Sequence, residues 1–367
     1  MNYNTSIVKI PENLLIENNI DKIIELPVFE KASKLLKRGE TVAFPTETVY
    51  GLGADARNPE AVKRIFKAKG RPQDNPLIVH IANFEQFEMV KNNNFNLDDD
   101  LFNILKAFWP GPLTVILPKS KLIADRTTAN LQTVGIRMPS HPVSLSLIES
   151  SDTPLAAPSA NISGFPSPTT AHHVYEDLKG KIPLIIDGGH CKVGVESTII
   201  KIKDEEIIIL RPGGISREEL ANISKRKIKN NEKNIKDERK KIEQKSPIAP
   251  GMKYKHYSPE TKLILYKSNF ENLFNYITKN SNKKLALVMT KESIDKLKRK
   301  NDFDFANIEL LKIGSLNKIR DIANRLFYTL RELDKAEFDL IIIEKIPEKG
   351  IGEAVMNRIY KATSDLI

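Results

Sequence analysis

Phe44-Pro-Thr-Glu-Thr-Val-Tyr-Gly-Leu-Gly53 is the stretch that decides the fold of the first half of this 367-residue chain. It follows the apolar segment 41–44, which predicts a short buried strand ending at Pro45. Hydroxyl groups and one carboxylate then lead into glycines, which predicts a turn at a strand end. Such a turn can bind a small polar ligand. A threonine-rich turn that caps a helix remains the alternative.

Helical and strand patterns alternate on both sides of this stretch. Residues 58–69 predict a helix, because Pro59 suits a first helical position and Gly70 and Pro72 stop the helix from continuing. A helix is also predicted at 101–108, and strands at 77–81, 113–117, 134–138, 155–157, 184–187, 197–202 and 207–210. Many strands mixed with helices indicate an α/β layer architecture over residues 24–220.

A second pattern begins after a charged linker and a proline-rich loop at 221–260. Strands are predicted at 263–266, 285–289, 308–313 and 340–344, and helices at 270–277, 291–298, 319–333 and 352–364. Strand–helix alternation at this spacing predicts a small parallel βαβ domain of the Rossmann type over 261–367.

Composition narrows the class of protein. The chain contains one cysteine, Cys191, so it can form neither an intramolecular disulfide nor a cysteine-cluster metal site. We find no signal-peptide pattern and no apolar run of about 20 residues, so we expect a cytoplasmic protein without a membrane segment. GxxxxGK[ST], GxGxxG and HExxH motifs are missing, so neither a P-loop nor a dedicated metal site is expected.

The net charge of +10 is concentrated in one place. Between Ser224 and Lys245, ten Lys or Arg stand against four Asp or Glu, so +6 lies in one short stretch. Its Lys- and Asn-rich composition is typical of a solvated helix or a mobile linker. A weak contact with RNA is the alternative interpretation.

Two polar segments and one arginine are the remaining candidates for chemistry. Lys67, Lys69 and Arg71 stand at alternate positions, so an extended segment would direct all three cations to one side and suit a polyphosphate. Residues 157–168 form a proline-constrained loop with three Ser and one Asn. Arg137 lies within an apolar strand, where it needs a carboxylate partner from a ligand or from the protein.

Together and in this order, these segments resemble the YrdC-like family, the threonylcarbamoyl-AMP synthases, in the form with an additional C-terminal domain. The resemblance rests on Pro45-Thr-Glu-Thr-Val-Tyr-Gly-Leu-Gly53, Lys69-x-Arg71, Asn75-Pro-Leu-Ile-Val-His80, Trp109-Pro-Gly-Pro-Leu-Thr114, Gly135-Ile-Arg-Met-Pro139, Pro158-Ser-Ala-Asn161, Gly194-Val-Glu-Ser-Thr198 and Pro250-Gly-Met-Lys-Tyr-Lys-His-Tyr257. It implies a YrdC-like twisted mixed sheet with helices.

The resemblance also implies an activity. A nucleotidyltransferase of this family makes threonylcarbamoyl-AMP and pyrophosphate from L-threonine, bicarbonate and ATP. Its product passes to a tRNA threonylcarbamoyl transferase complex, which modifies ANN-decoding tRNAs. Mg²⁺ is expected to accompany ATP, held by the phosphates more than by protein ligands. A non-catalytic RNA-binding protein is the alternative, but it leaves the constrained loop and Arg137 unexplained.

Residue roles follow from the family pattern. We expect Lys69 and Arg71 to be catalytic by stabilising charge on the phosphates. The pattern implies L-threonine binding by Thr48, His80, Arg137, Ala157 (through its backbone) and Ser197, ATP binding by Arg71, Asn75, Thr133, Ser159, Asn161, Ser167 and Arg211, and a lid loop with Tyr254, His256 and Tyr257.

Overall fold

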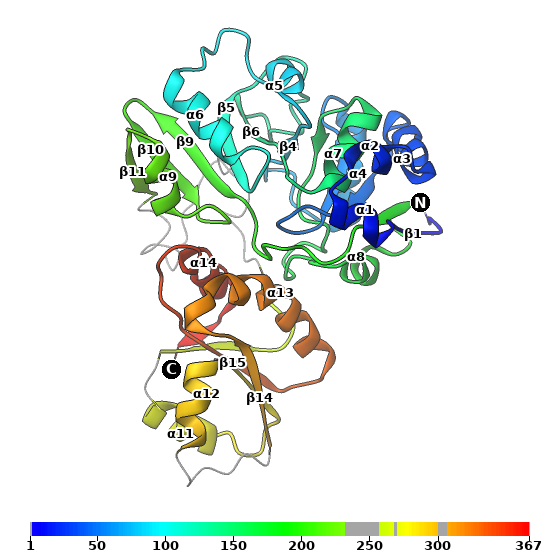
Figure 1. Ribbon diagram of the computed structural model, residues 1–367. Coiled ribbons are helices and arrows are strands. Elements are labelled where there is room, and N and C mark those ends of the chain that lie inside the picture. Colours follow the sequence, from blue (N-terminus) through cyan, green and yellow to red (C-terminus); the bar gives the residue numbers. More distant parts are fainter. Residues whose placement is uncertain (1, 232–256, 268–269, 300–306, 367) are drawn as a thin grey trace. The chain divides into compact units, whose positions relative to one another are not determined.

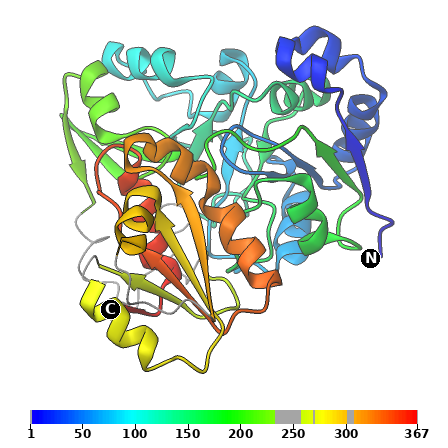
Figure 2. The same cartoon turned by 60° about the horizontal axis from the view of Figure 1, so that its bottom comes forward.

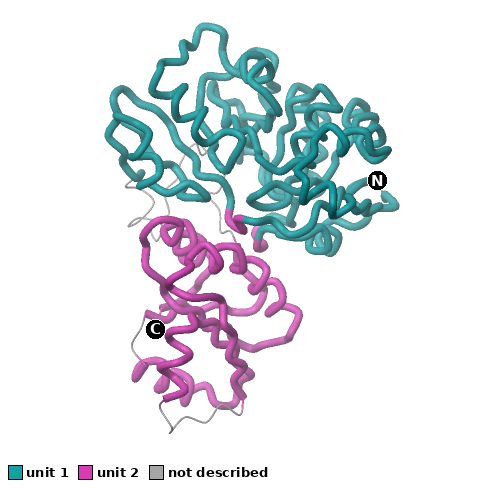
Figure 3. Tube along the Cα trace, viewed as in Figure 1, with its two compact units in different colours: residues 1–163, 167–192, 196–254 teal, residues 164–166, 193–195, 255–367 magenta. Residues whose placement is uncertain are grey.

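The computed structural model describes residues 2–231, 257–267, 270–299 and 307–366. The chain divides into two compact units (Figure 3). Unit 1 comprises residues 1–163, 167–192 and 196–254, and unit 2 comprises 164–166, 193–195 and 255–367. Within the described ranges, no helix is both long and apolar enough to cross a membrane. Each unit is described by itself below.

Unit 1 is built on one mixed, twisted sheet (Figure 1). Its eleven strands lie in the order β1-β8-β2-β3-β7-β4-β6-β5-β9-β10-β11. They are β1 (Ser6–Lys9), β2 (Val42–Phe44), β3 (Gly51–Asp55), β4 (Ile78–His80), β5 (Leu113–Pro118), β6 (Thr133–Arg137), β7 (Leu155–Ala156), β8 (Leu184–Asp187), β9 (Thr198–Lys203), β10 (Glu206–Arg211) and β11 (Lys227–Asn230). The α/β class predicted from the sequence is confirmed.

Helices cover this sheet. They are α1 (Glu12–Glu17), α2 (Ile20–Ile24), α3 (Pro27–Lys37), α4 (Pro59–Lys69), α5 (Phe84–Val90), α6 (Asp99–Phe108), α7 (Pro142–Ser151), α8 (Ala171–Leu178) and α9 (Arg217–Ile223). Successive strand residues enter different apolar clusters: Val42 and Phe44 join one, and Ala43 joins the other. This period of two means that both faces of the sheet are buried.

Strand β3 corrects an expectation, because Gly51-Leu-Gly53 continues as a strand where the sequence predicted a turn. The reason is the aromatic ring of Phe44 on the neighbouring strand β2. A Cβ atom on Gly51 would lie 3.2 Å from that ring, and one on Gly53 would lie 2.8 Å from it. Glycine is needed at both positions because the ring occupies the space of a side chain.

Strand β11 corrects a second expectation. Lys227–Asn230, predicted as part of a solvated helix or mobile linker, pairs in parallel with β10 at the edge of the sheet. Ile228 turns into the core while Lys227 and its alternate neighbour Lys229 face solvent. Lysines on an exposed edge strand discourage pairing with other chains.

Unit 2 contains a fully parallel five-stranded sheet in the order β14-β13-β15-β12-β16 (Figure 2). Its elements are β12 (Leu263–Tyr266), α11 (Phe270–Thr278), β13 (Leu285–Thr290), α12 (Lys291–Lys298), β14 (Ile308–Gly314), η1 (Leu316–Lys318), α13 (Ile319–Lys335), β15 (Leu340–Glu344), α14 (Gly352–Ala362) and β16 (Asp365–Leu366). The predicted Rossmann-like alternation is confirmed. The parallel pairing explains its continuous apolar strands.

Candidate active site

One edge of the unit 1 sheet collects polar side chains from five neighbouring strands. The register pairs His80 at the end of β4 with Arg137 at the end of β6. Strand β5 runs antiparallel to β6, so its beginning lies beside Arg137, and the beginning of β9 follows at Leu113↔Thr198. Strand β10 runs antiparallel to β9 and ends there with Arg211. Strand direction therefore brings together side chains that are far apart in sequence.

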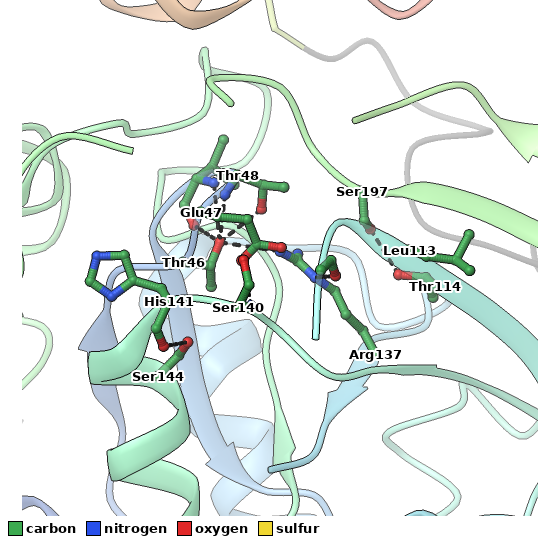
Figure 4. Close-up of polar contacts among 12 residues, drawn as sticks. Thr46, Glu47, Thr48, Leu113, Thr114, Arg137, Ser140, His141, Ser144 and Ser197 are labelled. Atoms are coloured by element: carbon green, nitrogen blue, oxygen red, sulfur yellow. Dashed lines mark hydrogen bonds and ion pairs between the residues drawn. The ribbon is translucent and has the colours of Figure 1, made fainter. Parts of the chain in front are cut away.

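Arg137 is the buried cation of this edge. Its Nη2 atom donates to Glu47 Oε1 at 2.6 Å, and both side chains are nearly inaccessible to solvent (Figure 4). Its Nε atom donates to the carbonyl oxygen of Gly111 at 3.4 Å. Among the described residues, Nη1 has no hydrogen-bond partner. The protein thus supplies the partner that the sequence left open and leaves one guanidinium nitrogen, Nη1, for a ligand.

Glu47 is held by the turn that follows β2. Its second oxygen, Oε2, accepts a hydrogen bond from the Ser140 backbone at 3.1 Å. The hydroxyls of Thr46 and Thr48 lie 2.7 Å apart, and the Thr46 hydroxyl also accepts from the Thr48 and Val49 backbone N–H groups. Arg137 and Ser140 therefore fix the carboxylate, and the threonine-rich turn sets Thr48 near Arg137 (Figure 4).

His80 is a neutral group at the same edge. Burial, together with the positive charge of Arg137, lowers the pKa of His80 to about 3. Its Nδ1 atom is buried and lacks a hydrogen-bond partner among the described residues. The ring packs edge-on against Phe44, with centroids 6.2 Å apart. A neutral imidazole with one open nitrogen can donate to or accept from an uncharged polar ligand group.

A second group of hydroxyls and one cation lies where β5, β9 and β10 meet. The hydroxyls of Ser197 and Thr114 are 2.8 Å apart (Figure 4). Arg211 donates through Nη2 to the Ser197 carbonyl at 2.9 Å and to its hydroxyl at 3.3 Å. Ser167 donates to Glu196 Oε1 at 2.7 Å, one residue before Ser197. Arg211 and Ser167, expected at ATP, thus lie with Ser197, expected at L-threonine.

Lys69 ends helix α4 and points into the proline-constrained loop. Its Nζ atom donates to the carbonyl oxygens of Ser159, at 2.5 Å, and of Asn161, and to Asn161 Oδ1 at 3.3 Å. The Ser159 hydroxyl donates to the same Oδ1 at 2.5 Å. The ammonium group therefore fixes this loop.

The expectation that Lys67, Lys69 and Arg71 share one side is wrong. Residues up to Lys69 are helical, and Gly70 ends the helix with a φ of 60°. Residues that are two positions apart in a helix point in directions about 200° apart, because one turn takes 3.6 residues. Lys67 accordingly faces solvent, whereas Lys69 is buried.

Three residues expected at ATP lie where β4 and β6 begin. Arg71 donates to the carbonyl oxygens of Asn75 and Pro76, at 3.4 and 3.1 Å. Asn75 Oδ1 is buried without a partner among the described residues. Thr133 is the first residue of β6. Since a strand rises about 3.3 Å per residue, Thr133 lies roughly 13 Å from Arg137 along the same strand.

Ala157 lies between these two groups. Its N–H donates to the Ile78 carbonyl at 2.9 Å, so only its carbonyl oxygen can serve a ligand. Arg71, Asn75, Thr133, Ala157, His80 and Arg137 thus extend along β4 and β6. Thr48 lies in the turn after β2, Ser159, Asn161 and Ser167 lie in the proline-constrained loop, and Ser197 and Arg211 lie where β9 and β10 meet. This arrangement suits an elongated ligand pair with a carboxylate at Arg137.

The expected lid loop falls largely outside the described residues, which exclude Tyr254 and His256. Tyr257 is described and belongs to unit 2. Its ring stacks on Phe327 at 5.3 Å, and the Arg358 guanidinium lies 5.4 Å from its centre. The lid stays a prediction.

Sequence reasoning assigned no role to three polar residues of this site: Glu47, Thr114 and Glu196. Glu47 and Glu196 stand beside the assigned residues Thr48 and Ser197, whereas Thr114 ends a motif in which no residue has an assigned role. The available signal was chemical, because a buried arginine requires a carboxylate and Glu47 is the acid of the first motif. No local pattern pairs Thr114 with Ser197, which lies 83 residues away.

Comparison with known proteins matches two family models that together cover most of the chain. A model described as "Telomere recombination" matches residues 34–213. A model described as "Threonylcarbamoyl-AMP synthase, C-terminal domain" matches residues 215–364. The boundary between the two matches falls directly after the Ser197–Arg211 group.

Similar proteins extend over nearly the full length. A threonylcarbamoyl-AMP synthase of Pyrococcus abyssi is 43% identical over 352 residues, covering 94% of this chain and 96% of the relative. That of Bacillus subtilis is 42% identical over 340 residues, covering 92% and 93%. A crystal structure of P. abyssi Sua5 complexed with L-threonine covers 98% of this chain and 97% of its own, with a TM-score of 0.80 and 40% identity. The chain therefore belongs to the threonylcarbamoyl-AMP synthase family.

Proposed function

We propose that the chain is a nucleotidyltransferase that makes threonylcarbamoyl-AMP and pyrophosphate from L-threonine, bicarbonate and ATP. The observation that carries this proposal is the half-open guanidinium of Arg137. Glu47 holds one of its nitrogens at 2.6 Å, and Nη1 has no partner among the described residues. A buried, oriented arginine suits the carboxylate of an amino acid. The family membership and the relative bound to L-threonine support threonine as that amino acid.

Neutral groups near Arg137 complete the proposed threonine site. The Ser197 hydroxyl and the open Nδ1 of His80 offer hydrogen bonds without adding charge. Thr48 contributes a hydroxyl, and Ala157 a carbonyl oxygen that can accept from the amine. Because these groups are buried, they limit the access of water that would protonate the carbamate and release CO₂.

The reaction requires two bond-forming steps. The threonine amine attacks the carbon of bicarbonate, and loss of water leaves a carbamate. A carbamate oxygen then attacks the α-phosphorus of ATP, and the bond to pyrophosphate breaks. Charge grows on the departing oxygen, so cations must lie nearby. We assign this role to Arg71 and to the charge of Lys69, whose ammonium group donates to Ser159 and Asn161 and so acts without a direct bond to phosphate.

The remaining ATP contacts are proposed for neutral side chains and one further cation. Asn75 has a buried, unpartnered Oδ1 atom, which can accept a hydrogen bond from a ligand. Lys69 already orders Ser159 and Asn161, so little conformational entropy is lost when these residues bind ATP. The proposed set is Arg71, Asn75, Thr133, Ser159, Asn161, Ser167 and Arg211.

Mg²⁺ is proposed to arrive with ATP. Within the described part of the chain, no group of three His, Cys, Asp or Glu could cage an ion. The neutral oxygens of Ser159 and Asn75 suit an ion held mainly by phosphates and water. When bound, the ion neutralises phosphate charge. We also propose that the product passes to a tRNA threonylcarbamoyl transferase complex.

Pyrophosphate release tests the proposed reaction. The full chain is incubated with ATP, Mg²⁺, bicarbonate and single amino acids. We expect release that requires both L-threonine and bicarbonate. Release that is independent of both, or no release at all, contradicts the proposal.

Variants test the phosphate assignment. Arg71→Ala and Lys69→Ala should each lower turnover on the order of 100-fold, as loss of one charge-stabilising group does. Lys67→Ala is the matched control, because Lys67 lies on the same helix but faces solvent. Folding is checked by circular dichroism. Near-normal turnover in either test variant removes that residue from the phosphate site.

A further inference from the structure

Unit 2 contains a pocket of about 360 Å³ at the carboxyl ends of its parallel strands. Tyr266 ends β12 and Glu344 ends β15, and both line it. The remaining lining residues are Phe270, Glu292, Ser293, Lys296, Leu316, Lys345, Ile346 and Pro347. All of them belong to unit 2. The volume is in the range that holds a small molecule.

Sheet topology explains why a pocket forms here. Helices α11 and α12 pack with β12, β13 and β15 in one apolar cluster, which fixes their face of the sheet. The connections through α13 and α14 run the other way across the sheet, so right-handed crossovers place them on the opposite face. The helix that follows β15 therefore lies on the opposite face of the sheet from the helices that follow its two neighbouring strands, β12 and β13. Such switch points open a crevice at the strand ends.

A carboxylate of the protein, that of Glu344, already lies at the N-terminus of helix α12, which is the positive end of the helix dipole. Glu344 is buried, and its Oε2 atom accepts from the Thr290 N–H at 2.8 Å and hydroxyl at 3.0 Å. Its Oε1 atom accepts from the Ser293 hydroxyl. The protein's own carboxylate thus takes the position where a helix start would bind an anion. A phosphate therefore cannot take this position at the helix start.

Tyr266 carries an unused hydroxyl into the same pocket. Its residue is 2% exposed, and its hydroxyl has no hydrogen-bond partner among the described residues. The register pairs Tyr266 with Glu344, so both side chains lie on one face of the sheet. Burial, together with the charge of Glu344, raises the pKa of Tyr266 to about 12, which keeps the hydroxyl protonated. A buried group of this kind is costly unless a ligand pairs with it.

Part of the remaining wall is aromatic and apolar. The rings of Tyr266 and Phe270 lie 6.0 Å apart at 36°, and Leu316, Ile346 and Pro347 add apolar surface. Three charged side chains also line the pocket: Glu292, which accepts from Ser315 and Leu316, Lys345, whose Nζ lies 3.0 Å from Glu348, and the exposed Lys296. A ligand must therefore combine a flat apolar body with polar atoms on one edge. It can accept from the Tyr266 hydroxyl and donate to the remaining lone pair of Glu344 Oε1.

We propose that this pocket binds the base of a nucleoside. A nucleobase has a π-face for the aromatic wall and adjacent donor and acceptor atoms on one edge. Base recognition needs no phosphate at the helix start, because Glu344 fills that position. This site is separate from the proposed reaction and does not depend on it.

Hydrogen–deuterium exchange of the full chain tests the proposal with a local readout. Adenosine, guanosine, cytidine and uridine are titrated separately to millimolar concentration, and ribose serves as the base-free control. We expect at least one nucleoside, but not ribose, to slow exchange in Lys291–Lys298 and Leu340–Glu344. No change with any nucleoside overturns the proposal, and an equal change with ribose overturns base recognition.

Paired variants test the assigned hydrogen bond. Tyr266→Phe should raise the midpoint of that titration about fivefold to tenfold, the effect of losing one hydrogen bond. Tyr276→Phe is the matched control, since Tyr276 lies on α11 outside the pocket lining. The proposal fails if the two variants shift the midpoint equally.

Discussion

Two buried glutamates, one in each unit, are stabilised in different ways. Glu47 in unit 1 faces a guanidinium, with Arg137 Nη2 at 2.6 Å. Glu344 in unit 2 faces neutral donors only, from Thr290 and Ser293 at the start of α12. Both carboxylates lie at the polar edge of a sheet.

The difference indicates which ligand charge the polar end of each sheet can accept. An ion pair leaves part of the arginine free, so the edge in unit 1 retains positive charge for a substrate carboxylate. Neutral donors satisfy Glu344 without adding a cation, so the start of α12 in unit 2 keeps no position for an anionic ligand. The two carboxylates should also respond differently when their partners are removed.

The largest effect is expected for Arg137→Met. This change leaves Glu47 buried without its cation, which costs about 3–5 kcal/mol of unfolding free energy. Pyrophosphate formation should be lost as well, because the proposed carboxylate ligand of L-threonine is gone. Urea denaturation and the pyrophosphate assay measure the two effects.

The double variant Glu47→Gln/Arg137→Met separates charge from function. Removing both charges should recover most of the stability but none of the activity. A double variant no more stable than Arg137→Met would contradict the ion-pair account. Recovered activity would contradict the role of Arg137 in threonine binding.

Thr290→Val should have a smaller effect on unit 2. It removes the hydroxyl that donates to Glu344 at 3.0 Å and accepts from the Ser293 N–H at 3.3 Å. Loss of a hydrogen bond to a charged group, together with a helix cap, should cost about 2–3 kcal/mol. Urea denaturation measures it, with the exposed Thr278→Val as the control. Equal stability of both variants would show that the backbone N–H and Ser293 suffice for Glu344.

The next largest effect is expected from a fall in pH, which should lower the stability of unit 1 more than that of unit 2. The pKa of His80 is about 3 in the folded chain and about 6.5 when unfolded, so the unfolded state binds the extra proton below pH 6.5. Stability therefore falls as pH falls, by about 2 kcal/mol from this group between pH 7 and pH 5. No histidine follows His256 in the sequence, so unit 2 lacks this response after that position.

Local hydrogen exchange at pH 7 and pH 5, corrected for intrinsic rates, measures this difference. Protection should weaken around β4 and β6 and change less around β13 and β15. His80→Gln should reduce the pH dependence around β4 and β6, whereas the exposed His172→Gln should not. Part of the response of unit 1 should remain, because burial also lowers the pKa of His141 to about 4. An unchanged slope in His80→Gln would remove the histidine as the cause.

Local signals predicted several elements well. Asn58 caps helix α4, Pro59 begins it and Gly70 ends it in the left-handed region, as the sequence indicated. Helix α7 escaped prediction because nearly all its residues are buried, so Pro142–Ser151 lacks an amphipathic period. Strand β1 escaped because its partner β8 lies about 180 residues away.

In the candidate site, too, some features could be predicted from the sequence and others could not. Residue chemistry predicted that Arg137 needs a partner, but selecting Glu47 required the fold. Gly70 indicated where α4 stops, yet the direction of Lys69 depends on a loop 90 residues later. The open atoms of His80 and Asn75 are defined by missing partners, which only the packed structure reveals.

The smallest change in unfolding free energy is expected when the unpartnered hydroxyl in the unit 2 pocket is removed. Tyr266→Phe removes a buried hydroxyl that has no partner among the described residues, so the free chain loses no hydrogen bond. Since an unpaired buried polar group is itself unfavourable, we expect an unfolding free energy that is unchanged or higher by about 1 kcal/mol. Thermal denaturation without nucleoside measures it, and Tyr276→Phe is again the control. A clear loss of stability would mean that the hydroxyl has a structural partner, and the reason for assigning it to a ligand would disappear.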